Sequence, residues 1–285
     1  MNGFLLIDKP KDWTSRDVCN KISRIFQTKK VGHIGTLDPF ATGLLIIALG
    51  EATKAIPYLE NLDKTYLAEL ILGNKTNTGD MTGKVIETKA VPKLDDIFIK
   101  ETLNSFLGES MQIPPMTSAI KVNGKKLYEL AHKGIEIERK ERKIYIYNID
   151  SINHNLNSIT FLSRVSKGTY IRTLGEDIAN KLGTVGHLSN LRRIQVGVFN
   201  VKDATTIDKC NNDSVISIKE ILTKYMHVEI VRNSKILKLI ENGCSIKFNL
   251  NEKYDKILLV NEKDQPLAIY SLNDEQYVCQ RGFVK

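Results

Sequence analysis

The sequence predicts an α/β protein of two domains, in which a larger first domain is followed by a small domain rich in β-strands. The chain has 285 residues, and a domain holds roughly 150 residues on average. Over residues 1–225, short apolar runs typical of strands alternate with amphipathic helical segments. From residue 226 onward, one short helix precedes several strand-like runs. We therefore predict one domain at residues 1–225 and a second at residues 226–285.

The first domain opens with a predicted buried strand at residues 4–7 and a helix that runs from its predicted N-cap, Ser15, to about Thr28. Residues 32–43 contain three glycines and a proline, which predicts an irregular segment. Residues 44–49 form a buried apolar run, and residues 64–73 alternate as a half-buried strand does. Further helices are predicted from after Pro92 to about 106, at 170–182 and just before 225, and further strands at 144–149, 158–165 and 191–199.

The second domain is predicted to be small and rich in strands, and it contributes little to the net charge. A helix is predicted at 234–241, with strands at 257–260, 267–270 and 277–283. The chain has a net charge of +8, of which +7 lies in the first 225 residues. This excess fits a polyanionic partner such as nucleic acid, although basic proteins that bind no nucleic acid are also common.

The sequence lacks the usual marks of secretion, of membrane insertion and of a bound cofactor. Its four cysteines, at 19, 210, 244 and 279, form no CxxC pair, which indicates a reduced, cytoplasmic protein. The longest apolar run has six residues, whereas about 20 are needed to cross a bilayer. No P-loop, dinucleotide-binding or HExxH motif occurs. If the protein is an enzyme, we expect a reaction without metal or cofactor.

The densest unusual segment is residues 32–43, which read GHIGTLDPFATG. Its glycines permit positive φ angles and close approach of a ligand or another backbone. Pro39 favours an extended conformation at Asp38. A carboxylate on such a loop can act as an acid, a base, a metal ligand or a nucleophile. It can equally close a turn through its own backbone, and the local pattern leaves these alternatives open.

This segment resembles the GHTGTLDPxATG signature of the TruB family of tRNA pseudouridine synthases, with Ile34 in place of the usual threonine. Other segments match the same family in order, and together they span residues 3–193. They are GFLLIDKP (3–10), GEATK (50–54), KTY (64–66), PPMTSA (114–119), GKKLYEL (124–130), SKGTYIRTL (166–174), HL (187–188) and LRR (191–193). Asp12 departs from the family pattern, because many relatives have glycine there.

The resemblance implies a pseudouridine synthase fold, with a mixed, mainly antiparallel sheet, helices packed outside it and Asp38 in a central cleft. It also implies an RNA-gripping insert at about residues 112–143 and a PUA-like RNA-binding domain at 226–285. The implied activity is isomerisation of uridine 55 in the T-loop of tRNA, on a flipped-out base and without a cofactor. The T-arm of tRNA would be the partner of a protein that is expected to be a monomer.

Three residues would carry the reaction if the resemblance holds. Asp38 matches the family's nucleophile, and the sequence leaves open whether it attacks the ribose C1′ or the uracil ring. Arg172 would pair with Asp38 and hold it ionised, since a nearby opposite charge lowers a carboxyl pKa. Tyr66 would stack on the uracil and handle the C5 proton. The structural alternatives are a helix-surface cation for Arg172 and a core aromatic for Tyr66.

Five further residues would bind the substrate. His33 would take the place of the extruded base, or else only support its loop. Tyr170 and Leu191 would line the pocket, with core packing as the alternative. Lys9 and Lys54 match basic family positions, where they could support the active site, contact phosphate or simply be solvated.

Two other functional classes remain as alternatives at this point. A non-catalytic tRNA-binding or tRNA-folding protein could keep the same scaffold, although the presence of Asp38, Tyr66 and Arg172 argues against it. A uridine methyltransferase or glycosylase is the second alternative, but no glycine-rich pocket for a methyl donor is evident. The basic stretch from Lys121 to Lys143 would contact RNA, or would form an ordinary solvated face.

Overall fold

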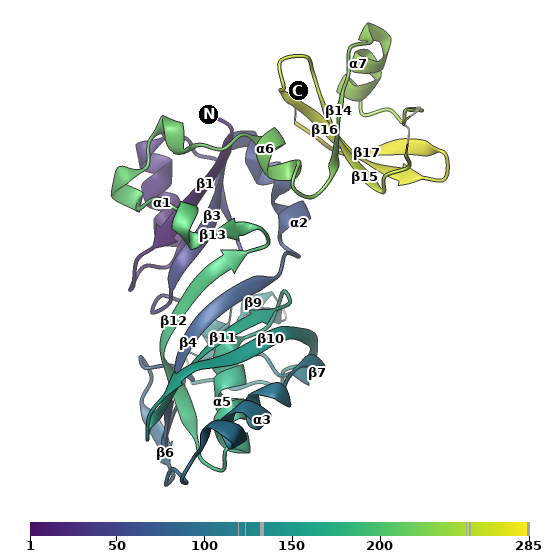
Figure 1. Ribbon diagram of the computed structural model, residues 1–285. Coiled ribbons are helices and arrows are strands. Elements are labelled where there is room, and N and C mark those ends of the chain that lie inside the picture. Colours follow the sequence, from purple (N-terminus) through teal and green to yellow (C-terminus); the bar gives the residue numbers. More distant parts are fainter. Residues whose placement is uncertain (119, 123, 132–133, 249, 251, 284–285) are drawn as a thin grey trace.

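The centre of the molecule is a nine-stranded mixed sheet (Figure 1). The computed structural model describes residues 1–118, 120–122, 124–131, 134–248, 250 and 252–283. Its main strand order is β1-β3-β12-β4-β11-β10-β7, with β2 and β13 paired at the side. In the described residues β3 and β12 pair in parallel and the other neighbours are antiparallel, which confirms the mixed, mainly antiparallel sheet. The bounds are β1 (Gly3–Lys9), β2 (Val31–Ile34), β3 (Thr42–Leu49), β4 (Lys64–Leu72), β7 (Gly108–Gln112), β10 (Arg142–His154), β11 (Ser158–Val165), β12 (Gly186–Val196) and β13 (Phe199–Asn200).

Helices α3 (Asp96–Asn104) and α5 (Ile171–Lys181) cover one apolar face of this sheet. In β4 every second residue is buried, as expected for a strand with one face in the core. Ile99 and Leu103 of α3 and Leu174 and Ile178 of α5 pack in one core with that face. The remaining small elements are the helices α1 (Ser15–Ile25), α2 (Ile56–Leu59), α4 (Leu127–Ala131) and α6 (Ile218–Leu222) and the strands β5 (Asn74–Thr76), β6 (Val85–Thr88), β8 (Lys121–Val122) and β9 (Lys125–Lys126).

The N-terminus of α1 differs from the prediction. Thr14, not Ser15, is the N-cap: its hydroxyl accepts the backbone N–H of Asp17 at 3.0 Å, and the Asp17 carboxylate accepts the backbone N–H of Thr14 at 3.0 Å. Asp17 stands three residues after Thr14, and this capping-box spacing selects the cap. Ser15 is buried, and its hydroxyl accepts the Leu37 N–H at 2.9 Å. It therefore ties the helix to the loop that carries Asp38.

Several other boundaries also differ from the prediction. The segment 32–43 is not wholly irregular, because Val31–Ile34 pairs with β3 as β2. Helix α1 ends at Ile25, and Gln27 has a φ of 48°, so the helix cannot continue to Thr28. The helix predicted between Pro92 and about Phe106 is the shorter α3, which Asp95 caps by accepting the Phe98 N–H at 2.8 Å. Residues 119, 123 and 132–133 of the predicted insert lie outside the described residues.

A second, four-stranded sheet forms the C-terminal part of the chain (Figure 1). Its strands are β14 (His227–Ile230), β15 (Lys256–Val260), β16 (Pro266–Asn273) and β17 (Gln276–Gly282), accompanied by helix α7 (Ser234–Glu241). The sequence pattern missed β14, which pairs in parallel with β15. Leu258, Val260 and Ile269 of this sheet share a core with Phe4 and Ile46 of the central sheet. The second sheet is therefore docked on the first through apolar contacts.

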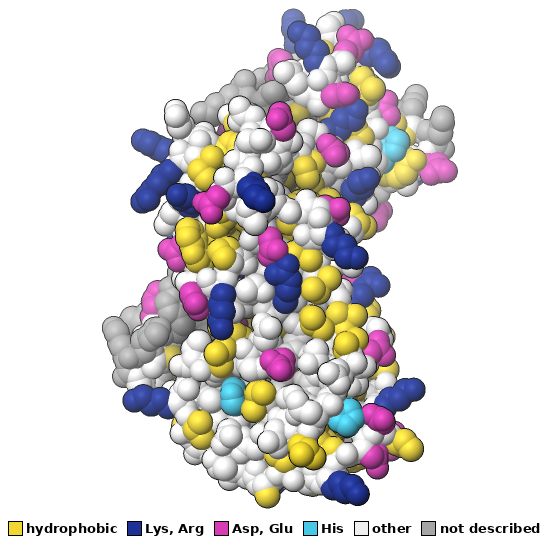
Figure 2. All heavy atoms as spheres, turned by 60° about the vertical axis from the view of Figure 1, so that its left-hand side comes forward, with side chains coloured by type: hydrophobic (Ala, Val, Ile, Leu, Met, Phe, Trp, Pro, Cys, Tyr) yellow, Lys and Arg dark blue, Asp and Glu magenta, His cyan; other side chains and the backbone are white. Residues whose placement is uncertain are grey.

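The surface carries charges of both signs. Figure 2 shows Lys and Arg side chains spread over one face of the molecule, with Asp and Glu side chains between them. In the described part of the chain, no helix is long and apolar enough to span a membrane.

Gly43 is required where the two parallel strands meet. It lies opposite Arg193 with a φ of 101°, and a Cβ there would lie 2.3 Å from the Arg193 carbonyl oxygen. Gly43→Ala is expected to destabilise the protein by about 3 kcal/mol or more, because backbone strain and a backbone clash add. Urea unfolding would measure this loss.

Gly243→Ala is the matched control for this variant. Gly243 also has a positive φ, 66°, but nothing lies within 4 Å of its added Cβ. It therefore carries the conformational cost without the clash. Equal stability losses in the two variants would show that the close approach at Gly43 is unimportant.

Candidate active site

A pocket of about 610 Å³ opens between the Asp38 loop, the first residues of β4 and the turn before α5. Six of the eight residues predicted from the sequence line it. They are His33, Asp38, Tyr66, Tyr170, Leu191 and Arg172. Lys9 and Lys54 are not among the lining residues. The fold thus brings together side chains from β2, β4, β12, α5 and two loops.

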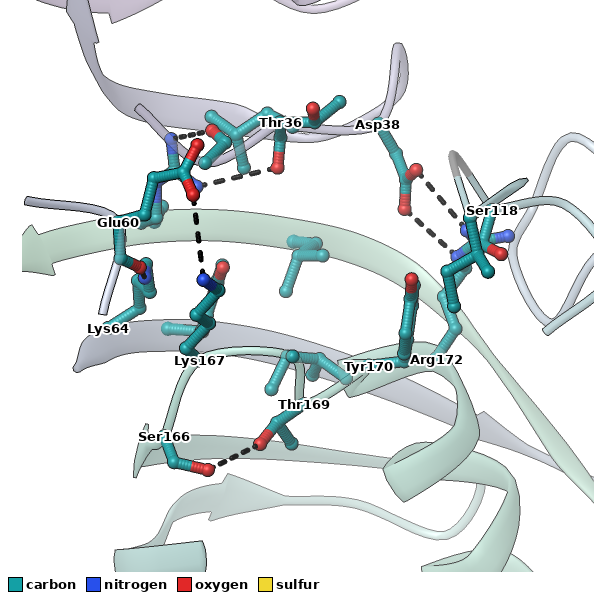
Figure 3. A pocket seen from close by; sticks show the side chains of 18 of the residues that line it. Thr36, Asp38, Glu60, Lys64, Ser118, Ser166, Lys167, Thr169, Tyr170 and Arg172 are labelled. Carbon is teal, nitrogen blue, oxygen red and sulfur yellow. Dashed lines mark hydrogen bonds and ion pairs between the residues drawn. The ribbon is translucent and has the colours of Figure 1, made fainter. Parts of the chain in front are cut away.

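Asp38 and Arg172 form a two-contact ion pair in this pocket (Figure 3). Arg172 Nε lies 2.9 Å from Asp38 Oδ2, and Nη2 donates to Oδ1 at 3.2 Å. The Arg172 side chain is only 4% exposed, whereas that of Asp38 is 32% exposed. The paired geometry that the sequence predicted is therefore present, with the arginine behind and the carboxylate toward the pocket.

A second carboxylate holds Arg172 from the opposite side. Asp80, which is buried, lies 3.4 Å from Arg172 Nη1. Asp80 Oδ1 in turn accepts the Thr82 N–H at 2.9 Å and the Thr78 hydroxyl at 2.9 Å. Arg172 also donates to the carbonyl and to the hydroxyl oxygen of Thr117, at the start of the predicted insert. Sequence reasoning missed Asp80, because nothing in the segment 74–83 indicates that it folds back onto Arg172.

Burial dominates the protonation of Asp38. Removal from water raises the pKa of the Asp38 carboxyl, and the guanidinium of Arg172 opposes this rise without cancelling it. The charge of Asp80 raises the same pKa further, while Lys9 lowers it. Arg172 therefore lowers this pKa, as the sequence predicted for a paired arginine, but burial has the larger effect in the opposite direction, which a sequence does not show.

Arg193 holds the loop that carries Asp38. This fully buried side chain on β12 donates to the carbonyls of Gly35 at 2.9 Å and Leu44 at 2.7 Å. Gly35 has a φ of 67°, which its lack of a side chain permits. Arg193 stands in the LRR motif, but no sequence pattern distinguishes a buried arginine from an exposed one.

Lys9 and Lys54 have structural positions outside the pocket. Lys9 is fully buried, and its ammonium donates to the carbonyls of Trp13 at 2.7 Å and Pro39 at 3.2 Å. Burial lowers the pKa of Lys9 to about 8. Lys54 donates to the carbonyl of Gly282 at 2.8 Å, and so joins the segment that follows β3 to the end of β17. Lys9 thus supports the loop that carries Asp38, whereas Lys54 links the two parts of the chain.

Tyr66, Leu191 and Tyr170 form walls of the pocket. Tyr66 lies on β4 opposite Arg193 of β12, and it is largely buried. Leu191 lies beside Ala68 on the same pair of strands. Tyr170 precedes α5, and its backbone N–H and C=O both bond to the side-chain amide of Gln112, at 2.8 and 3.1 Å. The aromatic rings are thus presented from two rigid supports.

His33 is fixed through both ring nitrogens. Nδ1 lies 3.6 Å from Cys19 Sγ, and Nε2 lies 3.1 Å from the Thr36 hydroxyl oxygen. Burial lowers the pKa of His33 to about 4, and the positive charge of Arg193 adds to this effect. The ring is therefore neutral near pH 7, which suits apolar stacking better than an ionic contact.

The lowered pKa of His33 makes a prediction about stability and pH. In the unfolded chain the pKa of this ring is near 6.5, whereas in the folded protein it is about 4. Because the unfolded state then binds more protons, stability falls as pH is lowered from about 6.5 to 4. His33→Phe is expected to remove this component, so its loss of stability on acidification should be smaller than that of the wild type.

Urea unfolding at pH 7.5, 6.0 and 5.0 would measure the difference. His154→Gln is the control, because His154 pairs with Asp96 on the surface, outside the pocket that contains His33. A parallel pH dependence in wild type and His33→Phe would contradict the prediction.

No group of three or more His, Cys, Asp or Glu side chains suited to a metal ion occurs among the described residues.

Sequence reasoning missed further residues of the site besides Asp80 and Arg193. It gave no role to Lys64, Lys167 and Glu60, which also line the pocket. Lys64 and Lys167 lie within matched segments, but a lysine in a motif gives no sign of whether it enters the pocket, and Glu60 lies in no matched segment.

Two family models match consecutive parts of the chain. Residues 23–171 match the TruB family pseudouridylate synthase N-terminal domain, and residues 172–228 match the tRNA pseudouridylate synthase B C-terminal domain. The chain is 46% identical to the tRNA pseudouridine synthase B of Clostridium kluyveri, with 87% of this chain and 86% of the relative covered. It is 43% identical to the protein of the same name from Clostridium tetani, again with 87% and 86% covered.

Solved structures share the fold over nearly the whole chain. A Cbf5-Nop10-Gar1 complex contains a chain that matches with a TM-score of 0.73 at 22% identity, covering 99% of this chain and 85% of the other. A chain of an archaeal box H/ACA Nop10-Cbf5 complex matches with a TM-score of 0.71 at 20% identity, covering 99% and 86%. The sequence matches, with the site geometry described above, show that this chain belongs to the TruB family of pseudouridylate synthases.

Proposed function

We propose that this protein converts uridine 55 in the T-loop of tRNA to pseudouridine, with Asp38 as the nucleophile. The observation that carries the proposal is the Asp38–Arg172 ion pair, which presents a carboxylate to a pocket walled by Tyr66 and Leu191. The relatives named tRNA pseudouridine synthase B support tRNA as the substrate. The pocket volume of about 610 Å³ lies within the range of about 300–1,000 Å³ that is usual for small-molecule sites.

The proposed reaction begins with extrusion of the base. A uracil inside a folded loop is out of reach until it is flipped, which costs a few kcal/mol. Stacking on an aromatic ring returns roughly 1–3 kcal/mol per base. Tyr66 would stack on the flipped uracil, and neutral His33 would take the place that the base leaves in the loop. Tyr170 and Leu191 would close the remaining walls.

Asp38 would then act on the bound nucleotide. Its carboxylate attacks and forms a covalent bond to the nucleotide, the N-glycosidic bond breaks, and the uracil turns. The uracil then rejoins the same sugar through C5, and the bond to Asp38 breaks. In the last step C5 loses its proton, which Tyr66 is the group we assign to handle, and N1, which left the sugar with the electron pair, takes up a proton. Arg172, held by Asp80, keeps the Asp38 carboxylate oriented during these steps. The balance is that of an isomerisation, so no group is imported and nothing is oxidised.

The remaining parts of the chain would bind the rest of the tRNA. Residues 112–143 would grip the T-arm, and Thr117, Ser118 and Ile120 at the start of this insert already contact Arg172 or line the pocket. The sheet at 226–285 would serve as a PUA-like RNA-binding domain after a catalytic domain at 1–225. A monomer that works in the cytoplasm is part of the same proposal.

One assay tests the proposal against its alternatives. Purified protein is incubated with unmodified tRNA, with nothing else added, and pseudouridine at position 55 is detected by carbodiimide labelling and primer extension. We expect modification at that position. Binding of tRNA without modification would favour a non-catalytic tRNA-binding protein. A requirement for an added methyl donor or metal would also contradict the proposal.

A further inference from the structure

One end of the pocket carries positive charges that the proposed chemistry does not use. In Figure 3, Asp38, Arg172 and Tyr170 lie at one end, whereas Glu60, Lys64 and Lys167 lie at the opposite end. A nucleotide also has two chemically different ends, because the sugar separates the base from the negatively charged phosphates. The positively charged end of the pocket is therefore suited to the phosphate end of a nucleotide.

Two buried cations meet below this end. Lys64 is only 6% exposed, and Arg193 is fully buried. A Cβ added to Gly35 would lie 3.3 Å from Arg193 Nη1 and 3.5 Å from Lys64 Cε, so both side chains converge under the same residue. The ammonium of Lys64 donates to the carbonyls of Glu60 and Leu62.

No carboxylate in the described part of the chain is a direct partner of either charge. Among the described residues, neither Lys64 nor Arg193 takes part in an ion pair; carbonyl oxygens are their partners. Burial lowers the pKa of Lys64 to about 8, and the charges of Arg193 and Lys167 lower it further. The carboxylates of Asp63 and Glu60 oppose this change only in part. Buried cations without a directly paired counter-charge are costly. They create a positive potential that an anionic ligand would relieve.

Lys167 and Glu60 lie at the rim of the same end. Lys167 stands in the turn before α5, next to Gly168, where an added Cβ would meet nothing within 4 Å. Its ammonium lies 3.5 Å from Glu60 Oε2, and the two side chains are 51% and 45% exposed. Exposed ion pairs of this kind contribute only about 0–1 kcal/mol. A stronger anion can therefore replace the Glu60 carboxylate.

We propose that Lys64 and Lys167, backed by Arg193, form a subsite for an RNA phosphodiester that flanks the flipped nucleotide, and that Glu60 occupies the anion position until RNA binds. With the base beside Asp38 and Tyr66, the sugar places its phosphate toward the cationic end. The subsite rests on the proposed function, since it requires RNA as the substrate.

Exchange of the two rim charges tests the subsite through binding of an unmodified T-arm hairpin RNA. Lys167→Gln is expected to weaken binding roughly 3- to 10-fold and to reduce the slope of log Kd against log salt by about 0.7–1. Glu60→Gln is expected to tighten binding by about 3-fold, because the competing carboxylate is gone. In turnover, both effects should appear in KM rather than in kcat.

Two controls separate the subsite from a general effect of charge. Lys30→Gln removes a lysine of similar exposure, 57%, which pairs with Glu51 outside the pocket. Glu101→Gln removes an exposed glutamate of α3 that lies outside the pocket and outside the predicted insert. If these controls change binding as much as Lys167→Gln and Glu60→Gln do, the subsite is refuted.

The decisive measurement combines a variant with a modified RNA. Hairpins carry a neutral methylphosphonate in place of the phosphodiester 5′ or 3′ of the target uridine. For one of the two positions, the neutral linkage should weaken binding by wild type but should add little penalty in Lys167→Gln. Additive losses at both positions would overturn the inference.

This result is independent of catalysis. Fluorescence anisotropy reports binding whether or not pseudouridine forms, so failure of the proposed reaction would not imitate failure of the subsite. If pseudouridine forms and the losses are additive, only the subsite is wrong. If the neutral linkage and Lys167→Gln are coupled but no pseudouridine forms, only the reaction is wrong.

Discussion

Replacing Asp38 with asparagine is expected to lower pseudouridine formation by at least about 10⁴-fold while tRNA binding is retained. Asparagine keeps the size of the side chain but cannot form the covalent bond that the reaction needs. The Asp38 side chain is partly exposed to the pocket, whereas Arg172 behind it keeps its second carboxylate partner, Asp80. The fold should therefore tolerate the change.

Single-turnover formation of pseudouridine, together with tRNA binding by anisotropy, measures the two effects separately. Asp12→Asn is the control. Asp12 lies near the same loop and donates its backbone N–H to the Pro39 carbonyl at 2.8 Å, but it does not line the pocket. Asparagine also tolerates its positive φ of 65°. Substantial turnover by Asp38→Asn would refute the nucleophile assignment.

Arg172→Met is expected to have the second large effect, on both stability and turnover. The change leaves Asp38 and buried Asp80 without their shared cation, and breaking a buried ion pair on one side costs about 3–5 kcal/mol. Turnover should also fall by about 10²-fold or more, because the carboxylate loses its fixed orientation. Arg172→Lys should recover only part of either loss, since an ammonium cannot reproduce the two-contact geometry.

Thermal and urea unfolding, with single-turnover rates at a temperature where the variant is folded, would measure these losses. Arg192→Met is the matched control: Arg192 also makes two contacts with an aspartate, Asp8, at 3.0 and 2.7 Å, but both side chains are about one-third exposed. A partly exposed pair should cost about 1 kcal/mol or less. Similar stability losses in both variants would contradict the role given to burial at Arg172.

The sequence predicted those parts of the fold that local patterns encode. The buried runs of β1 and β3 and the alternation in β4 follow directly from hydrophobic spacing. Capping was less certain, because Thr14 and Ser15 are both good caps and only the position of Asp17 distinguishes them. Strand β14 was missed, since its four residues are all half-buried and show no alternation.

The sequence predicted site residues only where they lie in segments that match a known motif. The resemblance named Asp38, Tyr66 and Arg172, and the fold places them in one pocket. Asp80 and Arg193 could not be assigned, because their partners come from segments that are distant in the sequence and close only in the folded chain. Chain segments far apart in sequence determine whether such a charge is buried, paired or solvated. The raised pKa of Asp38 has the same origin, since burial causes it.

The docking of the C-terminal sheet has a consequence for how the molecule unfolds and how it meets a large ligand. Leu258, Val260 and Ile269 contribute to the same apolar core as Phe4 of the first strand. A chain cut after residue 225 would leave that core open to water, so the two sheets should melt in a single cooperative transition. The distance between the two sheets is then fixed. An RNA that contacts both sheets must therefore adapt its own conformation to that distance, because the protein does not change it.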